Sequence, residues 1–574
     1  MRLLIAVTHL LFFIHDAHLH CTDGKPKDCL EAEFVPGTAL GGEGFDVTKM
    51  EQKGAYVIDM NQWKRKDKTC TLCSNPFMEN KKQKLPLSVE DWRAKQSCSA
   101  KVTSQLHKSS EALVSSSAKS IQNNWKSNLK VDVKDKSGSL MLAGTQSKMA
   151  DYSMEKTKND KYSFSTQGMS CEFYRFRISS SPKLHRDFRK AIKELPKCYN
   201  EKTKDQFYGL IDKFGTHYIT KVHAGGSVTS VTSIRECEAN LQGLSAEEVQ
   251  ACLEVEASAS FGVVVSTQSE AKHCKSDIQK SDKKSAFSSS FNERFTEIRG
   301  GHTTEPDLLF SAEKEPSAYK EWLNSLPQHP DIISYSLESL HQLLPSKSPS
   351  HSNLRSAISH YILERGLWKN CSAPCPAGVK TDPRDSCVCQ CHNNAGLNSN
   401  CCPSQKGLAR VIITVQRASG LWGDSTTPTD GYVKVFRGKT WWRSRVISNN
   451  NEPVFRYVVD WGDVNLLEDN KVRFEVWDED NKWDDDLLGE CERFLTPGVK
   501  EDVCNLQHGR LFFKWQVECA PNLGGNLCSD YKPSPVSPAL KGWYKSRNAH
   551  AVPKALLREW GVFVNGSISN HTKV

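Results

Sequence analysis

The sequence predicts a multidomain α+β protein, in which a large unit of antiparallel sheet and helices precedes a small disulfide-rich module and an all-β sandwich. Three observations predict this fold class. Two stretches in the first half alternate hydrophobic and polar residues beside a polar, helix-compatible run. Cysteines crowd around residue 390, and short β-rich runs separated by turn-forming clusters follow from Arg410 onward. The expected ranges are 1–20 for a signal peptide, 21–370 for the large unit, 371–407 for the cysteine-rich module, 408–519 for the sandwich and 520–574 for a C-terminal extension.

The N-terminus and the cysteine content predict secretion. Arg2 precedes an apolar run, residues 3–14, that is too short to span a bilayer as a helix and is typical of a signal peptide. The chain contains 21 cysteines, and such a number in a secreted protein indicates a disulfide scaffold. Zinc or redox chemistry is the weaker alternative, because the pair Cys70 and Cys73 has no second pair or histidine cluster at ligand spacing nearby.

The charge and hydropathy of the chain exclude two further classes of protein. The net charge is +9, but the lysines are spread widely, whereas nucleic-acid binding requires a concentrated basic face or a recognisable module. After the signal peptide, no apolar run approaches the length of a transmembrane helix. If the protein acts on membranes, it must insert something other than a hydrophobic helix.

Two stretches combine a strand pattern with a polar, helix-compatible run. In the first, alternation over 129–133 is followed by a polar, lysine-rich run at 146–161 and resumes at Tyr162 and Phe164. The second is sharper, with apolar or small residues at every odd position: Val255, Ala257, Ala259, Phe261, Val263 and Val265. Such a strand either packs one face on a soluble core or crosses a membrane in a β-barrel, with one face to lipid and one to a wet lumen. Alternation alone does not decide between them.

A short motif points to one family. Phe214-Gly215-Thr216-His217-Tyr218 is followed, after six residues, by Gly225-Gly226. This resembles the signature of the membrane-attack-complex/perforin family, with Phe214 where the family usually has Tyr or Trp. The resemblance implies a bent antiparallel sheet like that of the cholesterol-dependent cytolysins, flanked by two helical clusters, here 126–165 and 254–297. In that family each cluster unfurls into a transmembrane β-hairpin of a many-subunit pore.

Four glycines, two of them in the motif, have two interpretations. Gly225, Gly226, Gly300 and Gly301 could be hinges for this refolding, since glycine tolerates the required backbone angles, or they could mark tight turns and close packing. His217 is expected to be a buried hydrogen-bonding residue and not a catalyst.

The sandwich carries two acidic groups, around 424–430 and 478–486, and each follows a predicted strand. Carboxylates so close together repel unless a cation lies among them, and calcium takes six to eight oxygen ligands from such loops. The pattern resembles a C2 domain. The resemblance implies these calcium ligands: Gly423, Asp424, Thr427, Pro428, Asp430, Asp478, Asp480, Asp484, Asp485 and Asp486. Trp422 and Trp483 are expected to anchor the loops at the membrane interface, the alternative being a place in the sandwich core.

The cysteine-rich segment resembles an EGF-like module. The resemblance implies the pairs Cys21–Cys73, Cys29–Cys70, Cys98–Cys171, Cys237–Cys402, Cys252–Cys274, Cys371–Cys387, Cys375–Cys389, Cys391–Cys401, Cys491–Cys504 and Cys519–Cys528, and leaves Cys198 without a partner. Asn565 and Asn570 lie in N-glycosylation sequons of a polar tail. The resemblance also implies a glycosylated tail that is trimmed on maturation.

Three classes of function remain. The resemblance implies a secreted, calcium-dependent pore-forming cytolysin with no catalytic residue. Such a protein is stored in cytolytic granules, binds phospholipid membranes, assembles with its own copies into a ring or arc, and lets granule proteases pass. A terminal complement component is a variant of this class, but it would bring further modules that the sequence lacks. The alternatives are a calcium-dependent lipid-binding or adhesion protein and a secreted enzyme such as a phospholipase, although no Gly-x-Ser-x-Gly or His-Glu-x-x-His motif is present.

Overall fold

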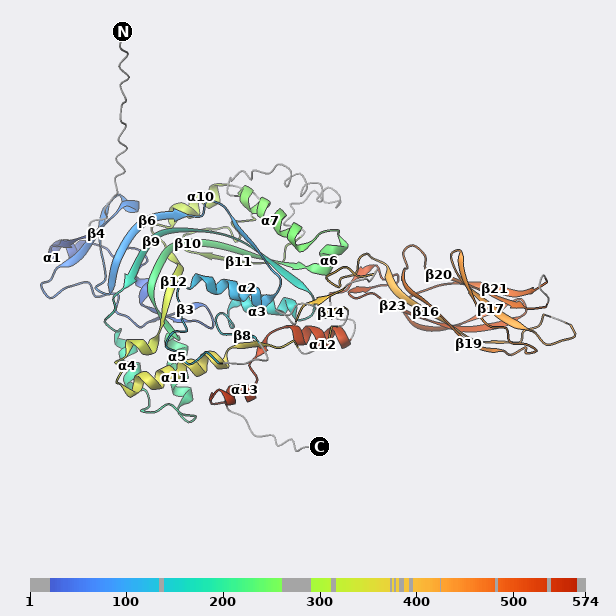
Figure 1. The fold of residues 1–574 in the computed structure, drawn as a ribbon. Coiled ribbons are helices and arrows are strands. Elements are labelled where there is room, and N and C mark those ends of the chain that lie inside the picture. Colours follow the sequence, from blue (N-terminus) through green and yellow to red (C-terminus); the bar gives the residue numbers. More distant parts are fainter. Residues whose placement is uncertain are drawn as a thin grey trace, which may run out of the picture.

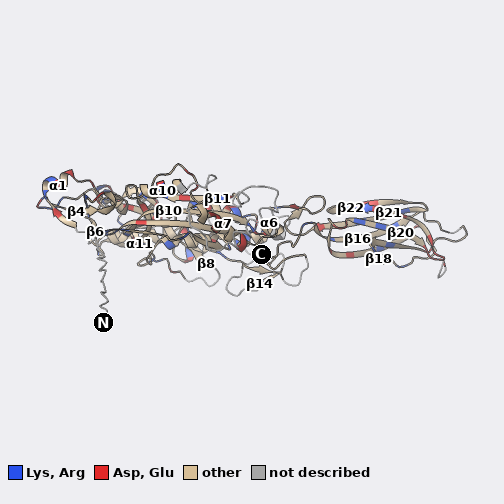
Figure 2. Ribbon diagram, turned by 90° about the horizontal axis from the view of Figure 1, so that it is seen from above, with Lys and Arg blue, Asp and Glu red and all other residues tan. Residues whose placement is uncertain are grey.

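The computed structural model describes residues 21–564 except 134–138, 261–290, 311–315, 372–373, 376–377, 381–386, 392–395, 424, 481–483 and 534–537. The molecule is elongated, with a mixed α/β body at one end and a β-sandwich at the other (Figures 1 and 2). Basic and acidic residues are interspersed along the ribbon (Figure 2). The expected signal peptide, 1–20, and the sequons at Asn565 and Asn570 lie outside the described residues.

The body is built on one antiparallel sheet whose longest strand is β10. On one side β10 pairs with β9, and on the other it pairs first with β12 and then with β11. Strands β6 and β7 pair in turn with β9, and β2 and β3 complete the sheet. The strands are β2 (Glu43–Asp46), β3 (Glu51–Tyr56), β6 (Val89–Cys98), β7 (Thr103–His107), β9 (Tyr162–Ile178), β10 (His217–Arg235), β11 (Arg294–Arg299) and β12 (Asp331–Ser339).

The glycines that could be hinges lie where backbones approach closely. The register of β10 shifts near Gly225 on both of its sides. A Cβ on Gly225 would lie 1.9 Å from the carbonyl oxygen of Cys171, and one on Gly300, whose φ is +71°, would lie 2.3 Å from that of Gly225. Gly226 faces Trp322 and Leu326 in the same way. Close packing therefore requires glycine here in this conformation, and a hinge role stays a prediction.

Helices flank the sheet in two clusters (Figure 1). The first lies between β7 and β9 and contains α2 (Ser110–Ser117) and α3 (Lys148–Thr157), so the polar run predicted to be helical is helical. The second lies between β10 and β11 and contains α6 (Glu236–Leu241) and α7 (Ala246–Ser260). The body also contains the helices α1 (Pro26–Glu31), α4 (Arg186–Glu194), α5 (Lys204–Phe214), α10 (Pro316–Ser325) and α11 (Pro349–Glu364).

Two strand predictions are wrong for this conformation. Residues 255–260 continue helix α7, because buried side chains recur at helical spacing: Val249, Cys252 and Leu253 in a small apolar cluster and Ala257 in the main core. Residues 261–265 lie outside the described residues. Residues 129–133 form no strand either; Leu129 and Val131 are buried in the main core and the amide of Lys130 donates to Ser359 of α11.

The sandwich consists of two four-stranded antiparallel sheets. Their inner faces share one apolar core that includes Val411, Ile413 and Val415 of β16, together with Phe474 and Phe513. One sheet has the order β19–β16–β23–β22 and the other β18–β17–β20–β21. The strands are β16 (Leu408–Ser419), β17 (Gly431–Arg437), β18 (Thr440–Arg443), β19 (Val454–Asn465), β20 (Lys471–Asp478), β21 (Asp486–Phe494), β22 (Gly498–Leu506) and β23 (Gly509–Cys519).

Disulfides connect the parts of the chain. The nine disulfides that the structure describes are nine of the ten pairs implied by the resemblance, among them Cys237–Cys402 between the body and the cysteine-rich module. Cys252 is also disulfide-bonded, and its expected partner Cys274 lies outside the described residues. Cys198 is a free, exposed cysteine. Within the described part of the chain, no helix is both long enough and apolar enough to span a membrane.

Candidate membrane-inserting and calcium-binding sites

Both helical clusters emerge from the same edge of the central sheet. Strand β7 ends at His107, opposite Phe164 of β9, and β9 begins at Tyr162, opposite Arg235 at the end of β10. Strand β11 begins at Arg294, opposite Thr232 of β10. At this edge the strands therefore lie in the order β7–β9–β10–β11, and each cluster connects two strands that end together. A cluster that became a β-hairpin would extend strands that are already paired.

Helix α7 of the second cluster contacts the sheet through apolar and polar side chains. Helix α7 packs Val249 and Leu253 on Ile234 of β10 and on Leu106 of β7. The side chain of Gln250 donates a hydrogen bond of 3.1 Å to the hydroxyl of Ser104 in β7. The inner face of the helix is small and partly polar, since Ala257, Ser258 and Ser260 are buried. Such a helix can leave the sheet at a smaller cost in apolar burial than a leucine-rich one.

The family motif forms the junction between α5 and β10. Phe214 ends the helix, and Gly215 takes a φ of +84° that favours glycine, against the backbone of Phe45. The hydroxyl of Thr216 accepts the amide of Val47 at 3.1 Å and donates to the carbonyl of Phe45 at 3.2 Å. The motif therefore fixes the start of β10 against β2.

His217 is buried, as expected, and it contacts the chain just before the first cluster. Its ring lies 2.8 Å from the Thr216 hydroxyl and 3.2 Å from the carbonyl oxygen of Trp125. Burial lowers the pKa of His217 to about 3, so the ring stays neutral at physiological pH. Its role is structural, because the buried neutral imidazole can donate its one N–H to the carbonyl oxygen of Trp125 without reaching solvent.

The two acidic groups of the sandwich meet at one end of it. The amide of Asp430, just before β17, donates to Oδ1 of Asp478 at the end of β20, with N and O 2.6 Å apart. A Cβ on Gly423 would lie 1.8 Å from Oδ2 of Asp478, so only glycine lets the first loop approach this carboxylate. Asp486 pairs directly opposite Asp478 in the β20–β21 ladder. The β16–β17 and β20–β21 connections thus bring carboxylates together at this end of the sandwich.

Two other groups orient these carboxylates. The backbone amide of Asn449 donates to Oδ1 of Asp430 at 2.6 Å, and the Tyr432 hydroxyl donates to Oδ2 of Asp485 at 2.8 Å. Burial, reinforced by Asp485, raises the pKa of Tyr432, so its hydroxyl keeps its proton and remains a donor. Sequence reasoning missed Asn449 and Tyr432, because neither residue type marks a calcium loop by itself.

The geometry of the loops fits a cation, although it does not form a complete site. Within the described residues, no three acidic, histidine or cysteine side chains converge at metal-ligand distance. Asp424 and residues 481–483, which include Trp483, lie outside the described residues. The guanidinium of Arg443 pairs with Glu479, which is not one of the expected ligands. Backbone approach at Gly423 and the oriented carboxylates of Asp430 and Asp485 are suited to oxygen ligation of calcium.

Trp422 lies beside this acidic end. Its side chain is 56% exposed and stacks on the ring of His508, with centroids 3.9 Å apart and an interplanar angle of 13°. It is therefore outside the sandwich core. A tryptophan held rigidly at a loop surface is suited to a membrane interface.

Comparisons with known proteins agree with this architecture. Family models match residues 36–369 as the MAC/Perforin domain, 370–404 as the Perforin-1-like EGF domain and 409–506 as the C2 domain. Perforin-1 of Homo sapiens is 42% identical over 517 residues, which cover 89% of this chain and 93% of the human protein. Perforin-1 of Mus musculus is 39% identical over the same shares of the two chains.

A more distant similarity is limited to part of the chain. The complement component C8 alpha chain of Oryctolagus cuniculus is 24% identical over 257 residues, 42% of this chain and 41% of that protein. The MAC/Perforin match and the perforin similarity identify a pore-forming, non-enzymatic family. The chain belongs to the membrane-attack-complex/perforin family and has the domain order of perforin: a MAC/Perforin domain, an EGF-like module and a C2 domain.

Proposed function

We propose that this protein is a secreted, calcium-dependent pore-forming cytolysin whose two helical clusters refold into transmembrane β-hairpins. The observation that supports this most is the shared edge at which β7, β9, β10 and β11 end. Refolding the segments 126–165 and 254–297 would extend four neighbouring strands across the bilayer. Copies side by side would then close a barrel, which satisfies every backbone hydrogen bond between strands.

The odd positions of the second segment would face lipid. Val255, Ala257 and Ala259 belong to helix α7 in the soluble form, and the alternation continues through Phe261, Val263 and Val265. The even positions are polar or small up to Gly262, which suits a wet lumen. Residues 254–260 of α7 are Glu, Val, Ala and Ser. This segment can adopt both conformations, because its apolar residues can pack on the sheet as part of a helix and face lipid as part of a strand.

The C2 domain would dock the protein on phospholipid when calcium is bound. The residues proposed to hold calcium are Gly423, Asp424, Thr427, Pro428, Asp430, Asp478, Asp480, Asp484, Asp485 and Asp486. Bound calcium supplies the positive charge that lets these acids approach anionic headgroups. Trp422 and Trp483 would then insert their rings at the interface.

Storage and cargo follow from the perforin similarity. We infer that the protein is kept in cytolytic granules, is secreted, and opens a path for granule proteases into the target cell. Glycans at Asn565 and Asn570 would lie on the C-terminal tail.

The proposed function predicts calcium-dependent leakage of liposomes. Purified protein should release a trapped dye in about 1 mM calcium and none with a chelator, since extracellular calcium modules bind at roughly 0.1 to 1 mM. Electron microscopy of the same liposomes should show rings or arcs. Calcium-dependent binding without leakage would instead identify an adhesion or lipid-binding protein, and released fatty acids or lysolipids would identify a phospholipase.

A further inference from the structure

The C-terminal extension packs on the first helical cluster. It forms β24 (Leu523–Gly524), β25 (Asp530–Tyr531), α12 (Pro538–Arg547), β26 (His550–Ala551) and α13 (Lys554–Glu559). Strand β26 pairs with β13 (Leu367–Lys369), which pairs on its other edge with β8 (Ser139–Met141) of the first cluster. Val552, Leu557 and Val562 are buried in the main core of the body.

Polar contacts join the extension to the end of helix α3 and to its neighbour α2. The amide side chain of Asn548 donates to the carbonyl oxygen of Thr157, the last residue of α3, at 2.7 Å. The backbone amide of Ala549 donates to the carboxylate of Glu111 in α2 at 2.9 Å. If this cluster is to refold into a hairpin, these contacts must break.

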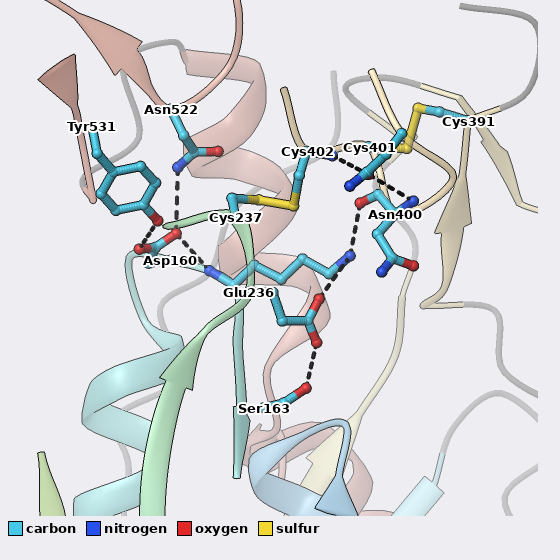
Figure 3. The surroundings of a disulfide bond; sticks show 12 residues. Asp160, Ser163, Glu236, Cys237, Cys391, Asn400, Cys401, Cys402, Asn522 and Tyr531 are labelled. Atoms are coloured by element: carbon cyan, nitrogen blue, oxygen red, sulfur yellow. Dashed lines mark hydrogen bonds and ion pairs between the residues drawn. A yellow bond between two sulfur atoms is a disulfide. The ribbon is translucent and has the colours of Figure 1, made fainter. Parts of the chain in front are cut away.

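The most buried contact is centred on Asp160, between α3 and β9, which is 1% exposed (Figure 3). The Tyr531 hydroxyl donates to Oδ2 of Asp160 at 2.5 Å, and the side chain of Asn522 donates to Oδ1 at 3.3 Å. The backbone amide of Lys161 donates to the same Oδ1 at 2.7 Å. Both extension residues thus close over a carboxyl group that belongs to the first cluster.

A second set of contacts lies beside it. Lys161 Nζ pairs with Glu236 at 3.1 Å and donates to the carbonyl oxygen of Asn400 in the cysteine-rich module at 2.8 Å, while Ser163 donates to Glu236 (Figure 3). The disulfide Cys237–Cys402 fixes the same place covalently. The module and α6, which follows β10, are therefore joined covalently, whereas the extension is held at Asp160 by noncovalent contacts.

We propose that the C-terminal extension is a proton-controlled clamp on the first membrane-inserting segment. The contacts of Tyr531 and Asn522 with Asp160 hold the clamp closed. The proposal rests on the refolding of that segment under the proposed function. In the closed clamp Asp160 is buried, which favours its neutral form. When Asp160 is protonated, its own O–H can donate to the Tyr531 oxygen across the same short contact, in place of the bond that Tyr531 donates to the carboxylate. Opening exposes Asp160 to water, where it ionises, so acid favours the closed form and neutral pH favours the open one.

The surroundings of Asp160 support this direction. Burial, with a smaller contribution from Glu238, raises the pKa of Asp160 to about 7 in spite of the lowering effects of the Tyr531 hydroxyl, the Lys161 amide and Arg235. Tyr544 of α12 also faces this carboxyl group, and burial together with Asp160 raises the pKa of Tyr544, so it stays neutral. The closed form therefore holds its proton up to about pH 7, and the open form only up to about 3.8. The proton therefore stabilises the closed clamp fully below the open-form pKa of Asp160, about 3.8. This stabilisation is lost as pH rises through the closed-form pKa, about 7.

Hydrogen exchange of the soluble protein, without membranes or calcium, tests the clamp. After correction for intrinsic rates, the opening constant of residues 148–164 should rise by about 30-fold between about pH 5.5 and about pH 8, and residues 538–562 should open with them. Asp160→Asn keeps the acceptor oxygen but cannot ionise, so it should flatten this profile to less than about threefold. Tyr531→Phe should raise opening at every pH.

Tyr361→Phe is the matched control. It removes another buried tyrosine hydroxyl that donates to carboxylates, those of Asp212 at 2.8 Å and Asp46 at 3.1 Å, at a site that does not involve Asp160. It should leave the pH profile of residues 148–164 unchanged. The clamp is overturned if the opening constant of residues 148–164 does not change with pH in the wild type, or if it changes as steeply in Asp160→Asn. If Asp160→Asn fails to fold, an unchanged opening constant in Tyr531→Phe overturns the clamp. Failure of dye release with a steep exchange profile would refute the pore and not the clamp.

Discussion

Asp430→Asn is expected to raise the calcium concentration for half-maximal liposome binding by about tenfold or more, because it removes one charge from the proposed ligand set. The substitution keeps an acceptor for the amide of Asn449, which now donates to Oδ1 of Asp430 at 2.6 Å. The loop should therefore keep its shape. Asp430→Ala and Asp480→Ala should abolish binding at physiological calcium. Cosedimentation with phospholipid vesicles over a calcium titration measures the effect.

Asp463→Asn is the control for charge alone. Asp463 is an exposed residue of β19, in the other sheet of the sandwich, so its loss changes the net charge by the same amount. It should bind vesicles at the wild-type calcium midpoint. If Asp430→Asn and Asp463→Asn gave the same midpoint, the assignment of the calcium ligands would be wrong.

Tethering helix α7 to the sheet is expected to abolish pore formation without affecting membrane binding. Ser104→Cys in β7 and Gln250→Cys in α7 replace two side chains that now share a hydrogen bond of 3.1 Å, so a short bismaleimide can join them. A linked α7 cannot leave the sheet to form a hairpin. Dye release should fall by about 100-fold or more, since hairpin formation is required for the barrel.

The experiment is done in a Cys198→Ser background, because Cys198 is free and exposed and would react with maleimide. The same double variant capped with a monofunctional maleimide carries similar bulk and no link. It should bind and permeabilise vesicles like the uncapped protein. Full leakage by the linked protein would mean that α7 stays on the sheet in the active form.

Local sequence was sufficient to predict several parts of this molecule. The polar run at 146–161 contains helix α3, and the alternation at Tyr162 and Phe164 begins strand β9. The two acidic groups meet at one end of the sandwich because each follows a strand that ends there. These features depend on nearest neighbours in the chain, which a single sequence displays.

The remaining features depend on distant partners. Residues 255–260 alternate perfectly, yet they are helical because Val249 and Leu253 pack on Ile234 and Leu106. The extension after residue 520 shows only turn-forming residues and a polar end, so the contact of Tyr531 with Asp160 could not be foreseen. When tertiary packing decides the conformation of a segment, the spacing of its hydrophobic residues alone does not predict that conformation.

The most direct test of the refolding is an environment-sensitive dye placed singly at residues 256, 257, 258 and 259, again without Cys198. In the soluble protein Ala257 is buried and Ala259 is exposed, as their places on helix α7 require, so these two odd positions should report different surroundings. On calcium-containing liposomes the account predicts a period of two: 257 and 259 both report lipid, and 256 and 258 both report water. Retention of the helical pattern on membranes that the protein has permeabilised would contradict it.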